Sequence, residues 1–365
     1  MDKTKTISIT VTDNCNLNCT YCYERHKSNK CLSFETAKRI VNQEAEDTKG
    51  YDRIEFDLFG GEPFLEFELI NEITNYICEK GIDLPYTIFA STNGTLVHGS
   101  IQEWLKEHTG CFVCGLSIDG TRKMHNINRC NSYDEIDLDF FHEVYPEQDV
   151  KMTISKETLP DLAEGVIDLH RHGFLVSCNL AYGIDWSEPE NTSVLKRELN
   201  KLINYYLENP NVKPCSILDI GLNNVNAYED KCIRQCGAGI EMRSYDVNGV
   251  KYPCQFFMPL SIGNDKASKS FDLQFPDTYI DETHLDAECR KCVIKSICPN
   301  CPGSNYAATG NIYKRDMNMC MLNKITIKAC SYFKALQWKQ GLLNEEEDVE
   351  GLLNAIIKIQ EKLEV

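Results

Sequence analysis

Short apolar runs alternate with longer amphipathic stretches over the first 180 residues of the chain. Six runs rich in β-branched and aromatic residues are typical of strands, namely residues 5–11, 53–59, 86–91, 112–118, 150–154 and 175–181. Between them, apolar residues recur at helical spacing, as in 33–48, 66–80 and 159–172. Strands that alternate with helices predict a parallel sheet with crossover helices. We therefore expect an α/β fold, an open barrel of six strand–helix units.

The pattern changes near residue 210, where we expect a domain boundary. A helical stretch over 194–207 ends before Pro210. From Cys215 to Cys330 cysteines dominate and helical periodicity weakens, so we expect loops organised by bound metal rather than by an apolar core. The predicted regions are a barrel over 1–210, a cysteine-rich domain over 211–335 and a C-terminal helix over 336–365.

Charge and cysteine content narrow the classes of function. The 55 acidic residues outnumber the 38 basic ones, and the net charge of -17 argues against nucleic acids and anionic membranes as partners. No apolar run approaches the ~20 residues of a membrane span, and the polar start lacks the features of a signal peptide. We expect a cytoplasmic protein. There, nineteen cysteines do not form a disulfide framework, which leaves metal ligation as their main role.

Cys15, Cys19 and Cys22 form one loop directly after the first expected strand. Three thiolates can hold three irons of a cubane cluster and leave the fourth iron open to another ligand. A zinc site is the alternative, but zinc usually takes four close ligands. The next cysteine, Cys31, lies nine residues further on. The spacing favours an iron–sulfur cluster.

This loop resembles the CxxxCxxC loop of the radical S-adenosylmethionine (radical SAM) superfamily, in which Tyr21 would lie against the adenine of the cofactor. Gly60-Gly61-Glu62-Pro63 after the second strand matches the family's GGEP motif, which binds the cofactor's amino group. Glycines allow close backbone approach, and a carboxylate pairs with an ammonium. Alone, a Gly-Gly turn is an ordinary loop. Its position one strand–helix unit after the cysteines favours the cofactor-binding interpretation.

Two later strand ends resemble signatures of the subgroup that matures peptides and sulfatases. They are Ser91-Thr92-Asn93-Gly94 and Ser117-Ile118-Asp119-Gly120, the latter followed by His125-Asn126-Ile127-Asn128-Arg129. The resemblance implies that Ser117 and Arg129 bind the ribose and carboxylate of the cofactor. Asp119 is a candidate catalytic residue, although Asp-Gly after a strand is also a plain turn signal.

The C-terminal cysteines resemble those of the SPASM domain, which binds two auxiliary 4Fe-4S clusters. The resemblance implies a distal cluster on Cys289, Cys292, Cys298 and Cys320, and a proximal cluster on Cys236, Cys254 and Cys301 with Cys232 as the fourth ligand. Only two residues separate Cys298 from Cys301, where the family usually has three. A zinc ribbon is the alternative, since paired CxxC motifs serve zinc as readily as iron. The other eight cysteines are expected to be small buried apolar side chains: Cys31, Cys78, Cys111, Cys114, Cys130, Cys178, Cys215 and Cys330.

Taken together, the resemblance implies a partial (βα)6 barrel of the radical SAM type followed by a SPASM domain. Its cofactors would be S-adenosylmethionine and three 4Fe-4S clusters. The first cluster, reduced by a flavodoxin or ferredoxin, would split the cofactor into methionine and a 5′-deoxyadenosyl radical that takes hydrogen from the substrate. The auxiliary clusters would accept the electron left on the substrate. An electron-transfer or metal-scaffold protein without catalysis is an alternative of another class.

Two classes of substrate are candidates, a sulfatase and a ribosomal precursor peptide. In sulfatase maturases an aspartate that acts as a base follows the stretch that here reads Tyr252-Pro253-Cys254, but this chain has Gln255, a candidate catalytic position. An amide cannot act as a carboxylate base. This favours a peptide maturase that forms a thioether or related crosslink in a ribosomal precursor over formylglycine formation. Asp246 and Asp265 are candidate substitute bases.

Recognition of the precursor's leader is a further expectation. Because the first strand is expected to begin by Lys5, we expect leader recognition through another surface or a separate leader-binding protein.

Overall fold

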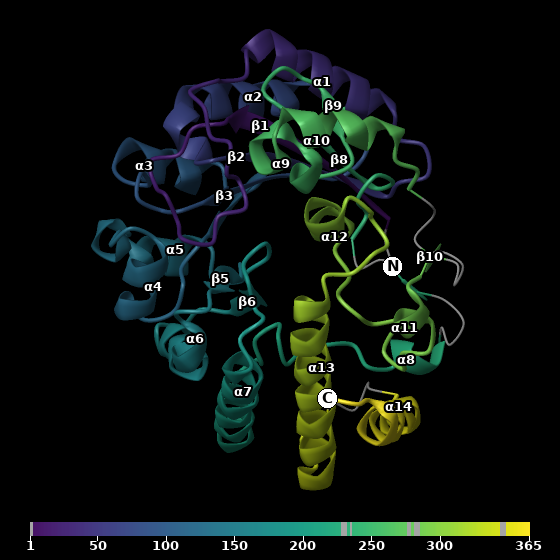
Figure 1. The fold of residues 1–365 in the computed structure, drawn as a ribbon. Helices are drawn as coiled ribbons and strands as arrows, with labels where there is room; N and C mark the ends of the chain where they lie inside the picture. Colours follow the sequence, from purple (N-terminus) through teal and green to yellow (C-terminus); the bar gives the residue numbers. More distant parts are fainter. Residues whose placement is uncertain (1–2, 228–231, 234–235, 276–278, 281–284, 344–347) are drawn as a thin grey trace. The chain divides into compact units, whose positions relative to one another are not determined.

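The computed structural model describes residues 3–227, 232–233, 236–275, 279–280, 285–343 and 348–365. The chain divides into two compact units, each made of separate segments (Figure 1). The first contains Met1–Ile118, His125–Lys151 and Gly237–Phe275, and the second contains Asp119–Met124, Met152–Cys236 and Pro276–Val365. The boundary predicted near residue 210 stays a prediction, because these units follow contacts rather than continuous sequence.

The first unit is built on a six-stranded sheet in the order β4-β3-β2-β1-β8-β9. The parallel strands are β1 (Thr4–Thr12), β2 (Arg53–Gly60), β3 (Tyr86–Thr92) and β4 (Phe112–Leu116). These four strands confirm the predicted runs to within two residues. β8 (Met242–Tyr245) pairs in parallel with β1, and β9 (Lys251–Tyr252) is antiparallel to β8. The sequence did not indicate that residues beyond 210 extend this sheet.

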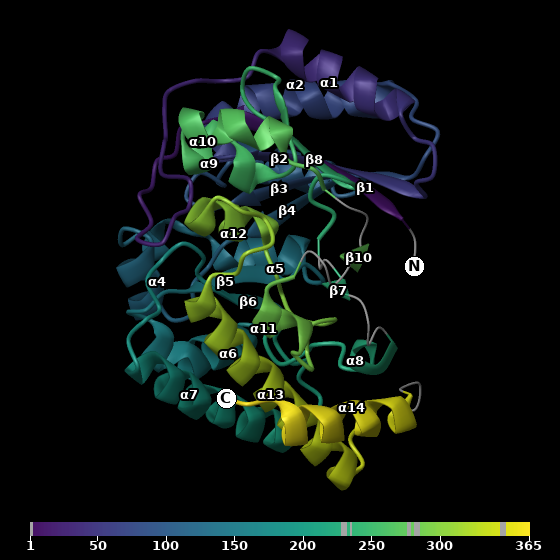
Figure 2. The same cartoon turned by 45° about the vertical axis from the view of Figure 1, so that its right-hand side comes forward.

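Helices cover the apolar face of this sheet. Figure 2 shows α1 (Phe34–Glu46) and α2 (Phe67–Glu79) side by side along it. Ser33 caps α1, because its hydroxyl accepts a hydrogen bond of 3.2 Å from the amide of Thr36, as expected for this residue type. The remaining elements of the unit are α3 (Ser100–Glu107), η2 (Tyr133–Glu135), α5 (Leu138–Val144), η1 (Pro63–Glu66), η4 (Gln255–Phe257), α9 (Pro259–Ile262), α10 (Asn264–Lys269) and η5 (Ser270–Asp272). α4 (Arg122–Asn128) has residues in both units.

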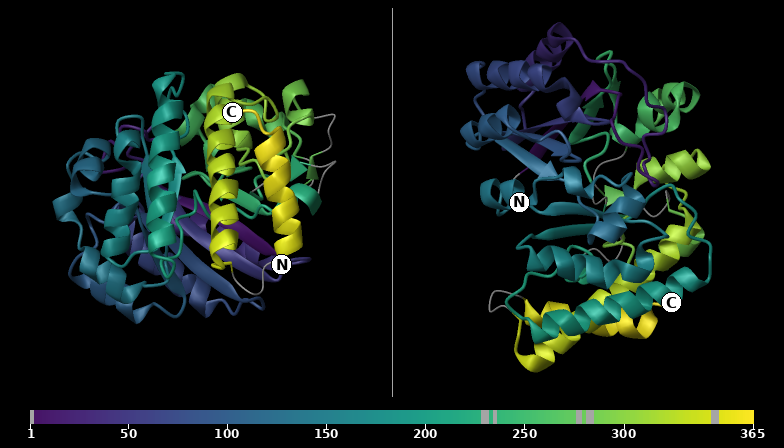
Figure 3. Two further views of the ribbon diagram at one scale, coloured as in Figure 1. Left: turned by 90° about the horizontal axis from the view of Figure 1, so that it is seen from below. Right: turned by 90° about the vertical axis from the view of Figure 1, so that its left-hand side faces the viewer.

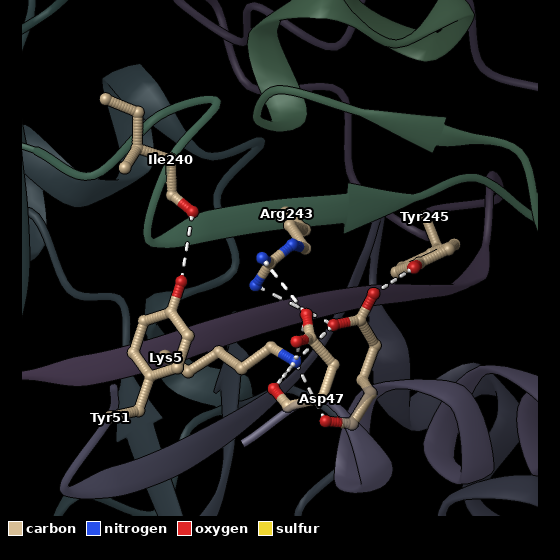
Figure 4. A network of polar contacts seen from close by, with 7 residues as sticks. Lys5, Asp47, Tyr51, Ile240, Arg243 and Tyr245 are labelled. Atoms are coloured by element: carbon tan, nitrogen blue, oxygen red, sulfur yellow. Dashed lines mark hydrogen bonds and ion pairs between the residues drawn. The ribbon is translucent and has the colours of Figure 1, made fainter. Parts of the chain in front are cut away.

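A buried ion pair joins β1 to the end of α1 (Figure 4). The ammonium of Lys5 lies 2.6 Å from the carboxylate of Glu44, and both side chains are almost fully buried. Lys5 also donates to the backbone oxygens of Glu44 and Asp47 at 2.8 and 2.7 Å. From β8, the Tyr245 hydroxyl donates to Glu44, and Arg243 lies 3.7 Å from the same carboxylate. The network therefore fastens β8 to the N-terminal strand and helix.

The second unit is mainly helical. It contains the strand pair of β6 (Val176–Leu180) with β5 (Val150–Ile154), whose residues from Met152 onward belong here, and the short pair β7 (Cys232–Ile233) and β10 (Tyr279–Ile280). Its helices are η3 (Leu159–Asp161), α6 (Leu162–Arg171), α7 (Glu190–Glu208), α8 (Asn224–Ala227), α11 (Ala287–Arg290), α12 (Pro302–Thr309), α13 (Met317–Gln340) and α14 (Val349–Lys362).

The long helices of the second unit contact one another. α13 packs against both α7 and α14, and Figure 3 shows the three helices running alongside each other. The expectation that helical structure weakens before Cys330 was wrong at α13, which runs for 24 residues. Buried apolar residues such as Leu322, Ile325 and Phe333 hold it against its neighbours. Within the described residues, none of the helices is both long and apolar enough to cross a membrane.

Four of the eight remaining cysteines depart from the expected burial. Cys114, Cys178, Cys215 and Cys330 are buried as predicted, whereas Cys31, Cys78 and Cys130 are exposed and Cys111 is half-buried. The cysteines that are not buried have polar partners. Cys31 contacts the Glu66 carboxylate at 2.8 Å, and the sulfurs of Cys78 and Cys111 lie 3.4 Å apart. The interpretation of these four as buried apolar side chains was therefore wrong.

Candidate functional site

The loop after β1 presents three half-buried thiols, those of Cys15, Cys19 and Cys22. The backbone of the loop is held locally. The amide of Cys15 donates to the side-chain oxygen of Asn14 at 2.9 Å, and the amide of Cys22 donates to the carbonyl of Cys19 at 3.2 Å. The amide of Leu17 donates to the Cys15 sulfur at 3.4 Å. Hydrogen bonds to ligating sulfurs are common around iron–sulfur clusters, where they tune the reduction potential.

The electrostatics of the loop suit ligation to a cation. Burial raises the pKa of the Cys15 and Cys22 thiols, and the nearby Glu24 carboxylate raises both further. The charge of Lys27 acts to lower the pKa of both thiols. A bound metal centre would supply the positive charge that the thiolates need, because coordination deprotonates a thiol. The three-sulfur donor set therefore fits an iron–sulfur cluster. No three His, Cys, Asp or Glu side chains of the described residues are arranged to hold a single metal ion.

The glycine pair after β2 packs against the start of the cysteine loop. A Cβ atom on Gly60, whose φ is +151°, would lie 2.3 Å from the carbonyl oxygen of Thr12. One on Gly61 would lie 2.3 Å from that of Asn14. The amides of Gly61 and Glu62 donate to these same two oxygens at 3.1 and 2.9 Å. The glycines are required for this close backbone approach, which brings the motif beside the thiols.

Glu62 is a buried carboxylate that joins three segments. It accepts hydrogen bonds from the Thr92 hydroxyl at 2.8 Å, the Asn93 amide at 2.7 Å and the Phe64 amide at 3.2 Å. Burial raises its pKa to about 7, although these bonds and the charge of Arg129 act to lower it. A buried, partly neutral carboxyl group becomes fully charged when a cation binds beside it.

Polar residues at the end of β3 complete this region. The side chain of Asn93 donates to Asn16 in the cysteine loop at 2.9 Å, and Asn16 donates to Thr95 at 2.8 Å. We did not assign these residues from the sequence. The segment 91–94 at a predicted strand end was the available signal, since polar residues there face the mouth of a barrel.

The segment at the end of α4 lies beside the cysteine loop. The amide of Thr20 donates to the carbonyl of Asn128 at 2.9 Å, and the Arg129 guanidinium lies 5.6 Å from the centre of the Tyr21 ring. Ser117 follows β4, where its amide donates to the carbonyl of Thr92 at 2.9 Å. The predicted cofactor residues all belong to the first unit: Tyr21, Gly60, Gly61, Glu62, Ser117 and Arg129.

Asp119 belongs to the second unit instead. Its carboxylate is fully buried and accepts a hydrogen bond of 2.9 Å from the amide of Thr153 in β5. This hydrogen bond supports the alternative that Asp119 has a structural role in the Asp-Gly turn. The catalytic assignment of Asp119 stays a prediction.

Gln255 begins η4, a segment that packs on the cysteine loop. The rings of Tyr23 and Phe256 stack with centroids 4.3 Å apart, and the amide of His26 donates to the carbonyl of Leu260 at 2.9 Å. The Gln255 amide group donates to the Ser8 hydroxyl at 3.2 Å and to the Asp57 carboxylate at 3.3 Å. Sequence reasoning missed Asp57. The alternation of β2, with polar residues at every second position, was the signal for it.

In the second unit, four cysteines line one pocket: Cys289, Cys292, Cys298 and Cys320. They are the four residues predicted for the distal cluster. Arg315 lines the same pocket and donates to the Cys298 sulfur at 2.6 Å. Burial raises the pKa of Cys298 to about 11, and the charge of Arg315 opposes this rise. Four thiols around a cavity, with a cation to support thiolates, fit an iron–sulfur cluster.

The cysteines predicted for the proximal cluster are divided between the units. Cys236 and Cys301 belong to the second unit, where the charge of Cys236 contributes to the raised pKa of Cys301, after the larger effect of burial. Cys254 is buried in the first unit. The side chain of Cys232 lies outside the described residues. The ligand set of this cluster stays a prediction.

Comparison with known proteins identifies the fold and family. Residues 9–190 match the Radical SAM superfamily. A solved structure of native anSMEcpe with bound AdoMet and a Cp18Cys peptide superposes with a TM-score of 0.69 and 19% identity, over 92% of this chain and 98% of that one.

Two curated relatives extend the comparison. The chain is 22% identical over 358 residues to the radical SAM cyclopropyl synthase TigE of Paramaledivibacter caminithermalis, which covers 90% of this chain and 74% of the relative. It is 32% identical over 126 residues to a cysteine-type anaerobic sulfatase-maturating enzyme of Clostridium perfringens, which covers 32% of each chain.

The chain belongs to the radical SAM superfamily and has the α/β fold of its maturases, which confirms the resemblance and the fold class expected from the sequence. S-adenosylmethionine and an iron–sulfur cluster are the cofactors of such an enzyme.

Proposed function

We propose that this chain is a peptide maturase that takes hydrogen from a residue of a ribosomally made precursor and forms a thioether or related crosslink. The observation that carries the proposal is the side chain of Gln255. It is an amide, and it donates to Asp57 in place of presenting a carboxylate of its own. An amide has no basic site for a substrate proton. The solved structures of anSMEcpe with a bound Cp18Cys peptide and of Streptococcus suis SuiB bound to the precursor peptide SuiA support a peptide substrate.

The residues divide into a cofactor site and two auxiliary sites. Cys15, Cys19 and Cys22 would hold the cluster that binds S-adenosylmethionine, and the pocket cysteines around Arg315 would hold the distal auxiliary cluster. When bound, the first cluster and S-adenosylmethionine supply a carbon radical able to remove a hydrogen atom from the substrate. Three clusters in all, an external electron donor such as flavodoxin or ferredoxin, and leader recognition through another surface or a separate leader-binding protein complete the proposal.

The chain's own residues would position the cofactor. Tyr21 offers a ring face for the adenine, and Arg129 beside it offers a charge for the cofactor's carboxylate. Glu62 would pair with the cofactor's ammonium group, since its carboxylate is held in place by Thr92 and Asn93. Ser117 would hold the ribose.

Glu62→Gln should weaken binding of S-adenosylmethionine by about 1.5 to 3 kcal/mol, the size of a lost charge-assisted hydrogen bond. The change removes the negative charge beside the ammonium while keeping the side chain's shape. Calorimetric titration of the iron-reconstituted protein measures the affinity, and its iron content should stay normal. Glu66→Gln is the matched control, because Glu66 lies in the same connection but contacts Cys31. An affinity equal to that of the unaltered protein would mean that the Gly60–Pro63 turn has a purely structural role.

The substrate is tested by offering two peptides side by side to reduced, iron-reconstituted enzyme with S-adenosylmethionine. One carries a sulfatase motif and the other is a Cys-containing precursor peptide. We expect the precursor to lose two hydrogens and its free thiol, as judged by mass and thiol alkylation, while the sulfatase peptide stays unchanged. A Cys→Ser form of the precursor is the control.

Formylglycine formation is the second candidate, supported by the similarity to the Clostridium perfringens enzyme. Formylglycine produced at a rate comparable to cofactor cleavage would establish it and overturn the thioether assignment. Gln255 would then be a neutral substitution.

A further inference from the structure

The inner face of β2 carries a carboxylate that the sequence did not assign. Ile54, Phe56 and Leu58 of this strand are fully buried against the helices. Successive side chains of a strand point to opposite faces, so Glu55 and Asp57 point to the other face. Asp57 is half-buried there and stands in register with Ser8 of β1. Because a carboxylate removed from water needs polar partners, the groups around Asp57 influence what it can do.

Two neutral donors fix one oxygen of this carboxylate. The Ser8 hydroxyl donates to Oδ2 of Asp57 at 3.1 Å, and the Gln255 amide donates to the same oxygen at 3.3 Å. Gln255 also donates to the Ser8 hydroxyl at 3.2 Å, which closes the group of three. Among the described residues, no hydrogen bond reaches Oδ1 of Asp57. The arrangement orients a carboxylate and leaves one oxygen able to accept a proton.

The charges around Asp57 suit a proton acceptor. Burial raises its pKa to about 6, and the carboxylate of Glu55 adds to the rise. The ammonium of Lys151, on β5, opposes it, as do the bonds from Ser8 and Gln255. The charge of Asp57 in turn contributes to the raised pKa of the Tyr23 phenol, after the larger effects of burial and of other groups. A base with a pKa near the working pH is ionised when needed and still takes up a proton readily.

We propose that Asp57 is the proton acceptor for oxidation of the precursor peptide, and that it acts from β2 rather than from the position of Gln255, where sulfatase maturases carry their base. The inference rests on the proposed function. Once a substrate C–H bond has lost its hydrogen atom, the substrate radical gives one proton to Asp57 and one electron to an oxidised iron–sulfur centre. The substrate loses two hydrogens overall, and the carboxylate becomes a carboxylic acid.

The location beside the cofactor loop supports this role. Gln255, which contacts Asp57, begins the segment that stacks on the cysteine loop through Phe256 and Tyr23. The two other candidate bases, Asp246 and Asp265, have different surroundings. Oδ1 of Asp246 accepts the amides of Asn248 and Val250 at 2.9 Å each, which commits this carboxylate to a turn. Asp265 is exposed in the first turn of α10.

Infrared titration tests the proton affinity of Asp57 without any turnover. With ¹³C-labelled aspartate, the unaltered protein should show a carboxyl band that titrates near pH 6 and is missing in Asp57→Asn. Gln255→Leu should move the titration to higher pH, because it removes a donor that stabilises the ionised form. An Asp57 carboxyl that is ionised throughout the range from pH 5 to pH 8 would overturn the proposal.

Peptide turnover tests the role itself, with the Cys-containing precursor peptide as probe. The ratio of oxidised peptide to 5′-deoxyadenosine should fall at least about 100-fold in Asp57→Asn, the usual effect of losing a general base. Asp57→Asn combined with Gln255→Asp returns a carboxylate about one hydrogen bond away and should recover much of the ratio. Glu72→Gln is the matched control, since it removes the charge of an exposed carboxylate on α2 and should leave the ratio within about two-fold.

The outcomes separate the two proposals. An unchanged ratio in Asp57→Asn would overturn the role of Asp57 and leave the proposed function standing. If the unaltered enzyme releases 5′-deoxyadenosine but leaves the peptide intact, the proposed function fails, and the role of Asp57 fails with it.

Discussion

Replacing Cys15, Cys19 and Cys22 together by alanine should abolish cofactor cleavage yet leave about eight irons per chain, the content of two cubane clusters. The three thiols lie in the first unit, whereas the pocket of Cys289, Cys292, Cys298 and Cys320 lies in the second. Removing the first set leaves the second set and its supporting Arg315 in place. Iron analysis and 5′-deoxyadenosine release after anaerobic reconstitution measure the two effects.

The matched control replaces three cysteines that have no proposed ligand role, Cys114, Cys178 and Cys330, by serine or alanine one at a time. Each should keep its full iron content if it folds. A soluble triple variant of the loop that holds no iron would contradict the assignment of separate cluster sites.

Lys5→Ala should lower the free energy of unfolding by about 3 to 5 kcal/mol, because it leaves the buried Glu44 carboxylate without its main cation. Lys5 and Glu44 are 2.6 Å apart with exposed fractions of 0% and 2% (Figure 4). Urea titration followed by circular dichroism measures the loss. Lys3→Ala is the matched control, because the Lys3 ammonium is half-exposed and 4.0 Å from Glu241. Its loss should cost no more than about 1 kcal/mol.

The double variant Lys5→Met/Glu44→Leu tests whether the loss of stability in Lys5→Ala comes from the unpaired buried charge of Glu44. Replacing both charges by apolar groups of similar size is close to neutral in many proteins, so this variant should recover part of the lost stability. A loss below about 1 kcal/mol in Lys5→Ala would mean that Arg243 and Tyr245 alone can hold the Glu44 carboxylate.

The sequence predicted the strands of the first unit well because their signals are local. β1 to β4 each have the apolar and β-branched runs that pack under helices, and their ends fall where glycine or polar residues begin. β8 could not be placed in the same way. Its four residues pair with β1 more than 230 residues earlier, and the bonds of Lys5 and Tyr245 that fasten it are not local. Pairings between distant segments leave no periodic mark on either segment.

The candidate site shows the same division between local and non-local signals. The cysteine loop and the Gly60–Glu62 turn are short motifs, so their residues could be assigned by position in the chain. The surroundings of Glu62, with donors from Thr92 and Asn93, depend on how β2 and β3 pack. Asp57 is important only because Gln255, far along the chain, comes to lie against it. The exposed cysteines were missed since cysteine has no sequence signal that separates an apolar role from a polar contact.

Cofactor cleavage is the most direct test of the account. The chain, purified without oxygen and fully reconstituted with iron and sulfide, should be incubated with dithionite and S-adenosylmethionine, and 5′-deoxyadenosine should be quantified by liquid chromatography. We predict its time-dependent release together with methionine, and none from the triple cysteine variant. A fully iron-loaded, reduced sample that releases no 5′-deoxyadenosine would contradict the assignment of this chain as a radical SAM enzyme.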